Sequence, residues 1–323
     1  MFDMHYDLLT ILYFNYKKNN PLGNPQKFIE DCKRIYHNDN IIGGIVNLYF
    51  ESPSEMKAEL GIDENELKDV KKMFKTSTEL FNELQAAGII PNGEFIFGIE
   101  GCDYLKDEKD LKHLYNMGLR SILPVWNNQN KFGSGIRGDI GLTDAGISLV
   151  REAIDLNMIV DVSHANIKTF YGILYTCYRS RLNGKSVNLI ASHSNVRSLC
   201  DRERNLNDGQ LHALNDNDGY IGLFTNGNFL SKDNTKLSSE ERVENYLKHL
   251  DYILNVIEFN PDRILTSTDN MDFMPDPSYV GLGVCPHENI SKVLYDAISS
   301  RYNEELANKI LVENAKKLIR KVR

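Results

Sequence analysis

Short, nearly continuous apolar runs alternate along this chain with longer segments in which apolar residues recur every three or four positions. Runs of the first kind are typical of parallel strands buried on both faces, and segments of the second kind are typical of amphipathic helices. Eight runs qualify as strands, at 2–4, 42–50, 94–100, 119–125, 158–162, 186–192, 219–225 and 263–268. The count and the alternation predict an α/β protein with a (β/α)8 barrel fold, although a doubly wound open sheet would give a similar pattern.

Two of the intervening segments carry signals for the start of a helix. Asp63 is placed to cap a helix over 64–87, and Thr143 is placed to cap one that runs to Asn157. No linker rich in Pro, Gly or Ser interrupts the series. We therefore expect residues 1–323 to form a single barrel domain.

Composition narrows the class of protein. The formal net charge is −8, which disfavours nucleic-acid binding. The five cysteines are odd in number and include no C-x-x-C pair, so a reducing compartment fits better than a disulfide framework. The first residues lack the basic segment of a secretory signal, and no apolar run approaches the ~20 residues that a membrane span needs. We expect a cytoplasmic protein that binds neither nucleic acid nor membrane.

Residue types that bind divalent metals lie at or just after the C-terminal ends of the predicted strands, where barrel enzymes place their chemistry. They are His5, Asp7, Glu100, His164, His193 and Asp269. Each one alone has an ordinary explanation, such as a satisfied polar residue at a strand end. Together they are too many for one tetrahedral zinc, and two metals bridged by a carboxylate and a water would use them all. The ordered combination therefore predicts a two-metal hydrolase.

The segments that contain these residues resemble the peptidase M19 family, the renal or membrane dipeptidases, within the amidohydrolase-like barrels. The stretches that carry the resemblance are His5-Tyr-Asp7, Gly98-Ile-Glu100-Gly101, Gly141-Leu-Thr-Asp-Ala-Gly146, Asp161-Val-Ser-His164 and the longest one, ASHSNVRSLCDRERN over 191–205. Their order and approximate spacing agree over nearly the whole chain.

The resemblance implies a metallo-dipeptidase that hydrolyses dipeptides, L-D as well as L-L, by means of a hydroxide that bridges two divalent metal ions. It implies that His5, Asp7 and a bridging Glu100 bind one ion. It implies that Glu100, His164 and His193 bind the other. Zinc is the expected metal, and a small peptide is the expected partner. Relatives also lead us to expect a homodimer.

The resemblance further assigns roles in handling the substrate. Arg204 falls where the family binds the substrate carboxylate, although a surface ion pair with Glu203 or Asp201 is the ordinary alternative. A guanidinium can pair with a carboxylate through two parallel hydrogen bonds, which suits the assigned role. Asp269 falls where the family has an aspartate near the metals, and we expect it to transfer a proton. Asp269 and the bridging Glu100 are therefore the predicted catalytic residues.

Two positions depart from the family pattern. Where many members have a histidine that stabilises the oxyanion, this chain has Trp126, with Asn127 beside it. Either the indole donates one hydrogen bond with help from Asn127, or Trp126 is a wall of the pocket, and we count both residues as candidates for substrate binding. Met271 and Asp272 replace residues of the pattern at the eighth strand. Two alternatives stay open: hydrolysis of another amide, a lactam, a lactone or an ester, and a metal-binding protein without catalysis.

Overall fold

A computed structural model of the chain describes residues 1–18, 30, 33, 40–50, 56–57, 64–233, 236–269, 283–284 and 289–323. Its parallel strands pair in chain order and are β1 (Phe2–Tyr6), β2 (Gly43–Tyr49), β3 (Glu94–Glu100), β4 (Leu119–Leu123), β5 (Ile159–Asp161), β6 (Asn188–Ala191), β7 (Tyr220–Phe224) and β8 (Ile264–Ser267). β8 returns beside β1, where the Asp269 N–H donates to the His5 carbonyl at 3.1 Å. The (β/α)8 barrel is confirmed, and the open sheet is excluded because the two end strands meet.

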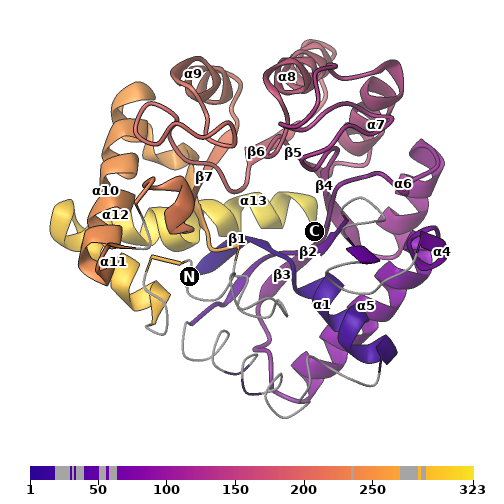
Figure 1. Ribbon diagram of the computed structural model, residues 1–323, viewed down its shortest axis with the longest axis horizontal. Coiled ribbons are helices and arrows are strands. Elements are labelled where there is room, and N and C mark those ends of the chain that lie inside the picture. The colour runs from indigo at the N-terminus through magenta and orange to yellow at the C-terminus, as the bar shows by residue number, and fades with distance from the viewer. Residues whose placement is uncertain are drawn as a thin grey trace.

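Helices connect the strands and form an outer layer around the barrel (Figure 1). They are α1 (Leu8–Lys18), α4 (Glu64–Leu67), α5 (Val70–Ala86), α6 (Glu108–Asn116), α7 (Asp144–Asp155), α8 (Ile167–Leu182), α9 (Asp208–Asp216), α10 (Ser239–Val256), α11 (Ile290–Arg301), α12 (Glu304–Asn308) and α13 (Asn314–Val322). Short 3-10 turns lie at Gly227–Phe229 and Pro261–Arg263, and a π-helical turn at Lys309–Glu313 joins α12 to α13. None of the described helices combines the length and the apolar character needed to cross a membrane.

The two predicted helix starts have different outcomes. Thr143 caps α7 as predicted, because its side chain accepts the Gly146 N–H at 3.1 Å. The prediction of one helix over 64–87 is wrong. The Asp69 carboxylate accepts the Lys72 N–H at 3.2 Å and starts α5 as a separate helix, since an Asp at this position satisfies an amide that has no partner inside the helix. Asp63 lies outside the described residues.

α13 closes the amino-terminal end of the barrel. Its apolar face, with Leu318, Ile319 and Val322, packs against inward-facing side chains from the early part of the strands. Those side chains are Phe2, Met4, Ile45, Ile96, Ile159, Ile190, Tyr220 and Leu265. Figure 1 shows α13 crossing the barrel close to β1 and β2. Because this end is filled by apolar packing, the polar residues gather at the carboxyl ends of the strands.

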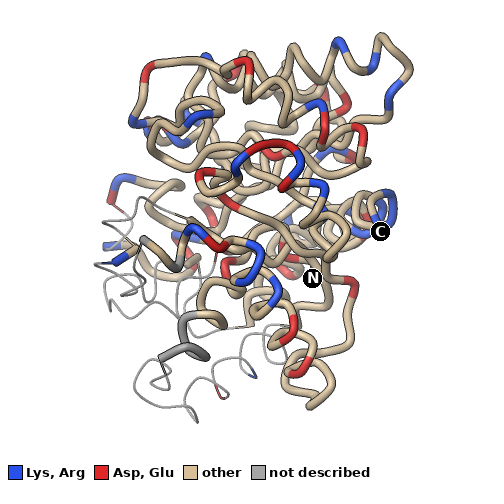
Figure 2. Tube along the Cα trace, turned by 90° about the vertical axis from the view of Figure 1, so that its right-hand side faces the viewer, with Lys and Arg blue, Asp and Glu red and all other residues tan. Residues whose placement is uncertain are grey.

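Charge is distributed over the outer segments rather than concentrated. Figure 2 shows acidic and basic residues interspersed along the trace, and many of them are neighbours of opposite sign. Examples are the ion pairs of Arg320 with Glu94 at 2.8 Å and of Arg301 with Glu244 at 2.7 Å. Exposed pairs of this kind contribute little to stability, so the fold depends on its apolar core.

Shortening Leu318 tests whether α13 is part of that core. Leu318→Ala should lower the free energy of unfolding by about 2–5 kcal/mol, because the side chain is fully buried and leaves a cavity. Urea denaturation measures the change. Lys317→Ala, on the exposed side of the same helix, is the control and should change the free energy by about 0.5 kcal/mol or less. Equal effects of the two substitutions would contradict this packing.

Candidate metal centre

Five of the predicted metal ligands meet at the carboxyl-terminal end of the barrel, and all five are buried. β1 and the residue after it supply His5 and Asp7, β3 ends in Glu100, and the segments after β5 and β6 supply His164 and His193. The residues form two overlapping groups, His5–Asp7–Glu100 and Glu100–His164–His193, within each of which the candidate ligand atoms lie no more than 4.8 Å apart. Glu100 is common to both groups.

The two carboxylate oxygens of Glu100 face different histidines. Oε2 lies 2.8 Å from His5 Nε2, and Oε1 lies 2.9 Å from His164 Nε2 and 3.7 Å from His193 Nε2. His164 Nε2 and His193 Nε2 are 2.9 Å apart. Asp7 Oδ1 lies 3.6 Å from His5 Nε2. The Nε2 atoms of three imidazoles therefore point at one carboxylate.

Neighbouring polar groups hold the opposite nitrogen of each ring. Asn127 Oδ1 accepts from His164 Nδ1 at 2.7 Å, which leaves a lone pair on Nε2 of the neutral ring. Ser192 Oγ lies 2.8 Å from His193 Nδ1 and 3.1 Å from His5 Nδ1. Because a hydroxyl has a single proton, Ser192 must accept from at least one of these rings. Such partners set the tautomer and the orientation of a metal-binding histidine.

An irregularity in β1 turns His5 into the barrel. Phe2 and Met4 both belong to the inner cluster, so strict alternation would direct His5 outward. The pairing of β1 with β2 shifts register between Asp3 and Tyr6, and His5 consequently faces Glu100. The Asp3 carboxylate accepts the His5 N–H at 3.2 Å and the Thr268 N–H at 2.9 Å. Asp3 thereby stabilises the irregular segment.

The pKa values follow from burial and from the charges that face one another. Burial, with a contribution from Arg204, lowers the pKa of His164 to about 3, and burial likewise holds the pKa of His193 well below its ordinary value. Burial also acts to lower the pKa of His5, but the carboxylates of Glu100 and Asp7 outweigh it and raise that pKa to about 10. Two rings are thus neutral at neutral pH, as metal binding requires, and the carboxylates attract positive charge.

The donor set fits a divalent cation. Asp7 Oδ1 and Glu100 Oε1 are buried and receive no hydrogen bond of normal geometry from the described residues. Buried carboxylate oxygens without donors are costly unless a cation compensates them. Imidazole nitrogens and carboxylate oxygens are the ligands that zinc and similar borderline ions prefer.

Arg204 lies beside this centre and is buried. Its Nη2 donates to the carbonyl of His193 at 3.2 Å, and its guanidinium carbon lies 5.9 Å from the ring centroid of Phe229. Burial lowers the pKa of Arg204 to about 10, so it remains protonated at neutral pH. The predicted alternative, a surface ion pair with Glu203 or Asp201, is wrong, because Arg204 is 8% exposed and has no ion pair within the described part of the chain.

Asp269 follows β8 and is half-buried. Burial raises its pKa to about 6, although the nearby His5 opposes that change. The backbone of Asp269 has a φ of +45°, and that of His164 has a φ of +66°. A positive φ is uncommon for residues other than glycine and costs conformational energy, so both side chains are held in place by their surroundings.

Trp126 lines the site next to His164. The two rings stack with centroids 5.6 Å apart and an interplanar angle of 29°, and the rings of Tyr49 and Trp126 make an edge-to-face contact with centroids 5.3 Å apart. Of the two roles predicted for Trp126, these contacts favour a wall of the pocket. Asn127 contacts His164 directly through its side-chain oxygen. Met271 and Asp272 lie outside the described residues.

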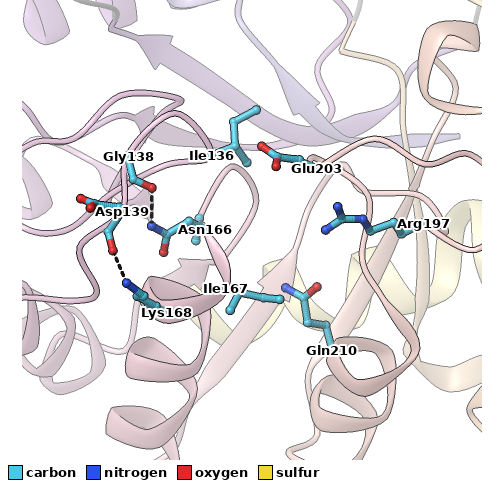
Figure 3. Close-up of a pocket in the computed structure, with 10 residues that line it drawn as sticks. Ile136, Gly138, Asp139, Asn166, Ile167, Lys168, Arg197, Glu203 and Gln210 are labelled. Atoms are coloured by element: carbon cyan, nitrogen blue, oxygen red, sulfur yellow. Dashed lines mark hydrogen bonds between the residues drawn. The ribbon is translucent and has the colours of Figure 1, made fainter.

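A pocket of about 290 Å³ opens next to the centre, between the start of α8 and the loop that precedes α9 (Figure 3). Ala165 and Glu203, which line the pocket, are the sequence neighbours of His164 and Arg204. Ile136, Ile167, Arg197 and Gln210 complete much of the lining. The pocket therefore combines apolar and charged groups at the edge of the site.

Comparison with known proteins identifies the family. The family described as membrane dipeptidase (peptidase family M19) matches residues 1–323. The chain belongs to peptidase family M19. A protein encoded in the pqqA 5′ region of Klebsiella pneumoniae is 31% identical over 233 residues, which cover 69% of this chain and 80% of that protein. Dipeptidase aclJ of Aspergillus oryzae is 24% identical over 185 residues, which cover 56% of this chain but only 41% of aclJ.

Solved structures show the same fold. A metallopeptidase from Rhodobacter sphaeroides, crystallised with a phosphinate mimic of L-Ala-D-Ala, superposes with a TM-score of 0.73 at 22% identity and covers 100% of this chain and 99% of that one. A second M19 peptidase, dipeptidase AC, superposes with a TM-score of 0.72 at 23% identity and covers 99% of this chain and 98% of its own. Similarity at this level of identity supports the barrel assignment.

The sequence did not point to several residues that organise this M19 site. Asp161 Oδ1 accepts the N–H of Ser163 at 2.9 Å and that of Ser192 at 3.1 Å, and it thereby joins the ends of β5 and β6. Asn47 Nδ2 lies 3.1 Å from His5 Nδ1. Asp161 lies at the end of a strand, and that position could have indicated a role in the site. Nothing in the local sequence indicates that Asn47 or Ser192 contacts the metal ligands.

Removing the Ser192 hydroxyl tests how these side chains hold the imidazoles. Ser192→Ala should weaken the binding of divalent metal by about 10–100-fold, since two rings lose a partner. Titration of the metal-free protein with Zn²⁺ or Mn²⁺ measures the affinity. Ser194→Ala is the control, because Ser194 is equally buried and its hydroxyl has no hydrogen-bond partner among the described residues. Unchanged affinity in Ser192→Ala would contradict this arrangement.

Proposed function

We propose that this protein is a metal-dependent dipeptidase that cleaves the peptide bond of dipeptides with a free C-terminal carboxylate. The observation that carries the proposal is the buried Arg204 guanidinium, which has no ion-pair partner among the described residues and lies against the backbone of His193. A buried cation without a counter-ion is costly. A substrate carboxylate would supply that counter-ion and would place the peptide bond a fixed distance away, over the ligand groups.

His5, Asp7 and Glu100 would hold one divalent cation, and Glu100, His164 and His193 would hold the second. The two geometric groups that share Glu100 support this division. Zinc is the metal we propose, because three imidazoles and two carboxylates suit it. When bound, such cations polarise a carbonyl and acidify water.

The chain's own residues would carry out the other parts of the reaction. Asp269 is half-buried, and its pKa of about 6 lets it take a proton from the attacking water and return one to the departing amine. Trp126 and Tyr49 form an aromatic edge that would limit the space for the substrate and exclude water. Arg204 would orient the peptide.

We propose that both L-L and L-D dipeptides are substrates. A clamp on the terminal carboxylate and a metal centre on the peptide carbonyl both act on groups that L- and D-residues share. The structural relative from Rhodobacter sphaeroides, which was crystallised with a mimic of L-Ala-D-Ala, supports this choice. A panel of dipeptides of both kinds, assayed by release of free amino acid, tests the stereochemistry.

Metal removal tests the cation assignment. Chelator treatment should abolish dipeptide hydrolysis, and added Zn²⁺ should restore it. Mass spectrometry of the metals should find about two ions per wild-type chain and about one in His164→Ala, because the His5–Asp7–Glu100 group remains intact. Hydrolysis that resists chelation, or one ion in both proteins, would contradict the assignment.

Substituting Arg204 tests recognition of the carboxylate. Arg204→Met should lower kcat/KM for a dipeptide by about 10²-fold or more, because the substrate carboxylate would be buried without a partner. The same variant should lose the preference of the wild type for a dipeptide over its C-terminal amide. Arg202→Met, which changes an exposed arginine on the same loop, is the control and should alter neither value.

The outcome also separates the alternatives. Turnover of substrates without a carboxylate, unaffected by Arg204→Met, would indicate hydrolysis of another amide, a lactam, a lactone or an ester. Binding of two metal ions without hydrolysis of any compound in a broad panel would indicate a protein without catalytic activity.

A further inference from the structure

The pocket between the starts of α8 and α9 has room for one small molecule. Its volume of about 290 Å³ lies at the lower end of the range for ligand sites in proteins. The first turns of both helices form part of the lining, and the loop over 195–206 forms another part. Neither Arg204 nor any of the five metal-ligand residues lines it, so it is distinct from the metal centre. We call it the α8–α9 pocket.

The lining carries two basic and two acidic side chains, which are Lys168, Arg197, Asp139 and Glu203. Lys168 Nζ donates to the Asp139 carbonyl at 2.7 Å. Arg197 donates through Nε to Asp201 at 3.1 Å, which leaves both of its Nη groups available. The Glu203 carboxylate has no hydrogen-bond or ion-pair partner within the described part of the chain. A ligand with both an anionic and a cationic group would therefore complement this pocket.

Gln210 adds a buried hydrogen-bond donor. The residue is only 5% exposed, and its Oε1 accepts the Asn207 N–H at 3.1 Å. Its Nε2 has no partner among the described residues. A buried amide donor without an acceptor is costly, and an oxygen of a ligand would remove that cost. Figure 3 shows the ends of Gln210, Arg197 and Glu203 directed toward one space inside the pocket.

The two helices favour an anionic group at the same place. Lys168 is the second residue of α8, and Gln210 is the third residue of α9. The first turn of a helix has partial positive charge because its N–H groups lack partners inside the helix. Together with Arg197 and the Gln210 amide, these helix starts suit a carboxylate.

Apolar side chains complete the lining. They are Ile136, Ala165 and Ile167, and Ile167 is 47% exposed although it is a large aliphatic residue. An aliphatic group of a ligand would cover this surface and remove it from water. The pocket thus offers a charged part and an apolar part side by side.

The loop that carries Arg197 and Glu203 is held by its own backbone. The Arg197 N–H donates to the Leu206 carbonyl at 2.8 Å, and Asn205 Nδ2 donates to the Phe229 carbonyl at 2.9 Å. Such contacts reduce the conformational entropy that the loop would lose when a ligand binds. The two charged groups are therefore preorganised.

We propose that the α8–α9 pocket binds a free aliphatic α-amino acid in its zwitterionic form. Arg197 and Gln210 would hold the carboxylate, and Glu203 would hold the ammonium group. The side chain would pack on Ile136 and Ile167. The proposed dipeptidase reaction releases such molecules beside the pocket, which makes them its natural occupants. Binding itself does not depend on that reaction.

Isothermal titration calorimetry of the metal-loaded full chain tests the proposal with L-leucine as the probe. L-Leucine should bind saturably to the wild type. Two analogues of similar shape separate the charges, because isocaproate lacks the ammonium group and isoamylamine lacks the carboxylate. Each should bind at least about 10-fold more weakly than L-leucine, since one charge-assisted set of hydrogen bonds is lost.

Substitutions locate the site. Arg197→Met and Glu203→Gln should each weaken the binding of L-leucine by about 10–100-fold. Arg202→Met, which changes an exposed arginine on the same loop, is the matched control and should not change the affinity. Binding should also persist in Arg204→Met and after treatment with a chelator, because neither change alters the pocket lining.

Three results would overturn the proposal. The first is no saturable binding of L-leucine, and the second is equal binding of either analogue. The third is binding that Arg204→Met abolishes but Arg197→Met leaves intact, which would place the amino acid at the metal centre. Failure of the dipeptidase assignment is a separate result, since a chain without dipeptide hydrolysis would still bind L-leucine.

Discussion

The carboxylate of Glu100 is buried at the end of β3, with one oxygen against His5 and the other against His164. Such a charge is stable in the interior only where positive or partly positive groups surround it on several sides. The barrel meets this requirement because parallel strands bring residues far apart in the chain to one rim. At the opposite end of the barrel, α13 and the early strand residues form an apolar cluster. The polar groups therefore lie at the carboxyl-terminal rim.

A set of side-chain hydrogen bonds around the ligand residues fixes the orientation of their rings. Asp161 ties the ends of β5 and β6 together, Ser192 contacts the rings of two histidines, and Asn127 holds a third. Networks of this kind in a low-dielectric environment gain strength when every member has a partner. His164 itself has a φ of +66°, a conformation that persists in a residue other than glycine only where the surrounding structure fixes it.

The inner and outer surfaces of the barrel serve different purposes. The barrel fold is shared with other M19 peptidases even where identity is only 22–23% over nearly the whole chain. The outer helices are free to differ, because their exposed faces are not constrained by the metal centre. The α8–α9 pocket lies between the two, because part of its lining comes from the segments that carry His164 and Arg204.

The sequence by itself determined the eight strands, the class of barrel and the residue types at the strand ends, because apolar periodicity and strand-end chemistry are local properties. It could not determine which way His5 points, since the register shift in β1 depends on pairing with β2 and on the Asp3 contact with Thr268, 265 residues away. It also failed to predict that a new helix starts after Asp69. The apolar residues keep one helical period on both sides of Asp69, so the pattern gave no sign of a second N-cap there. Whether Arg204 is a surface residue or a buried cation was decided only by the tertiary structure, for burial depends on the packing of segments distant in sequence.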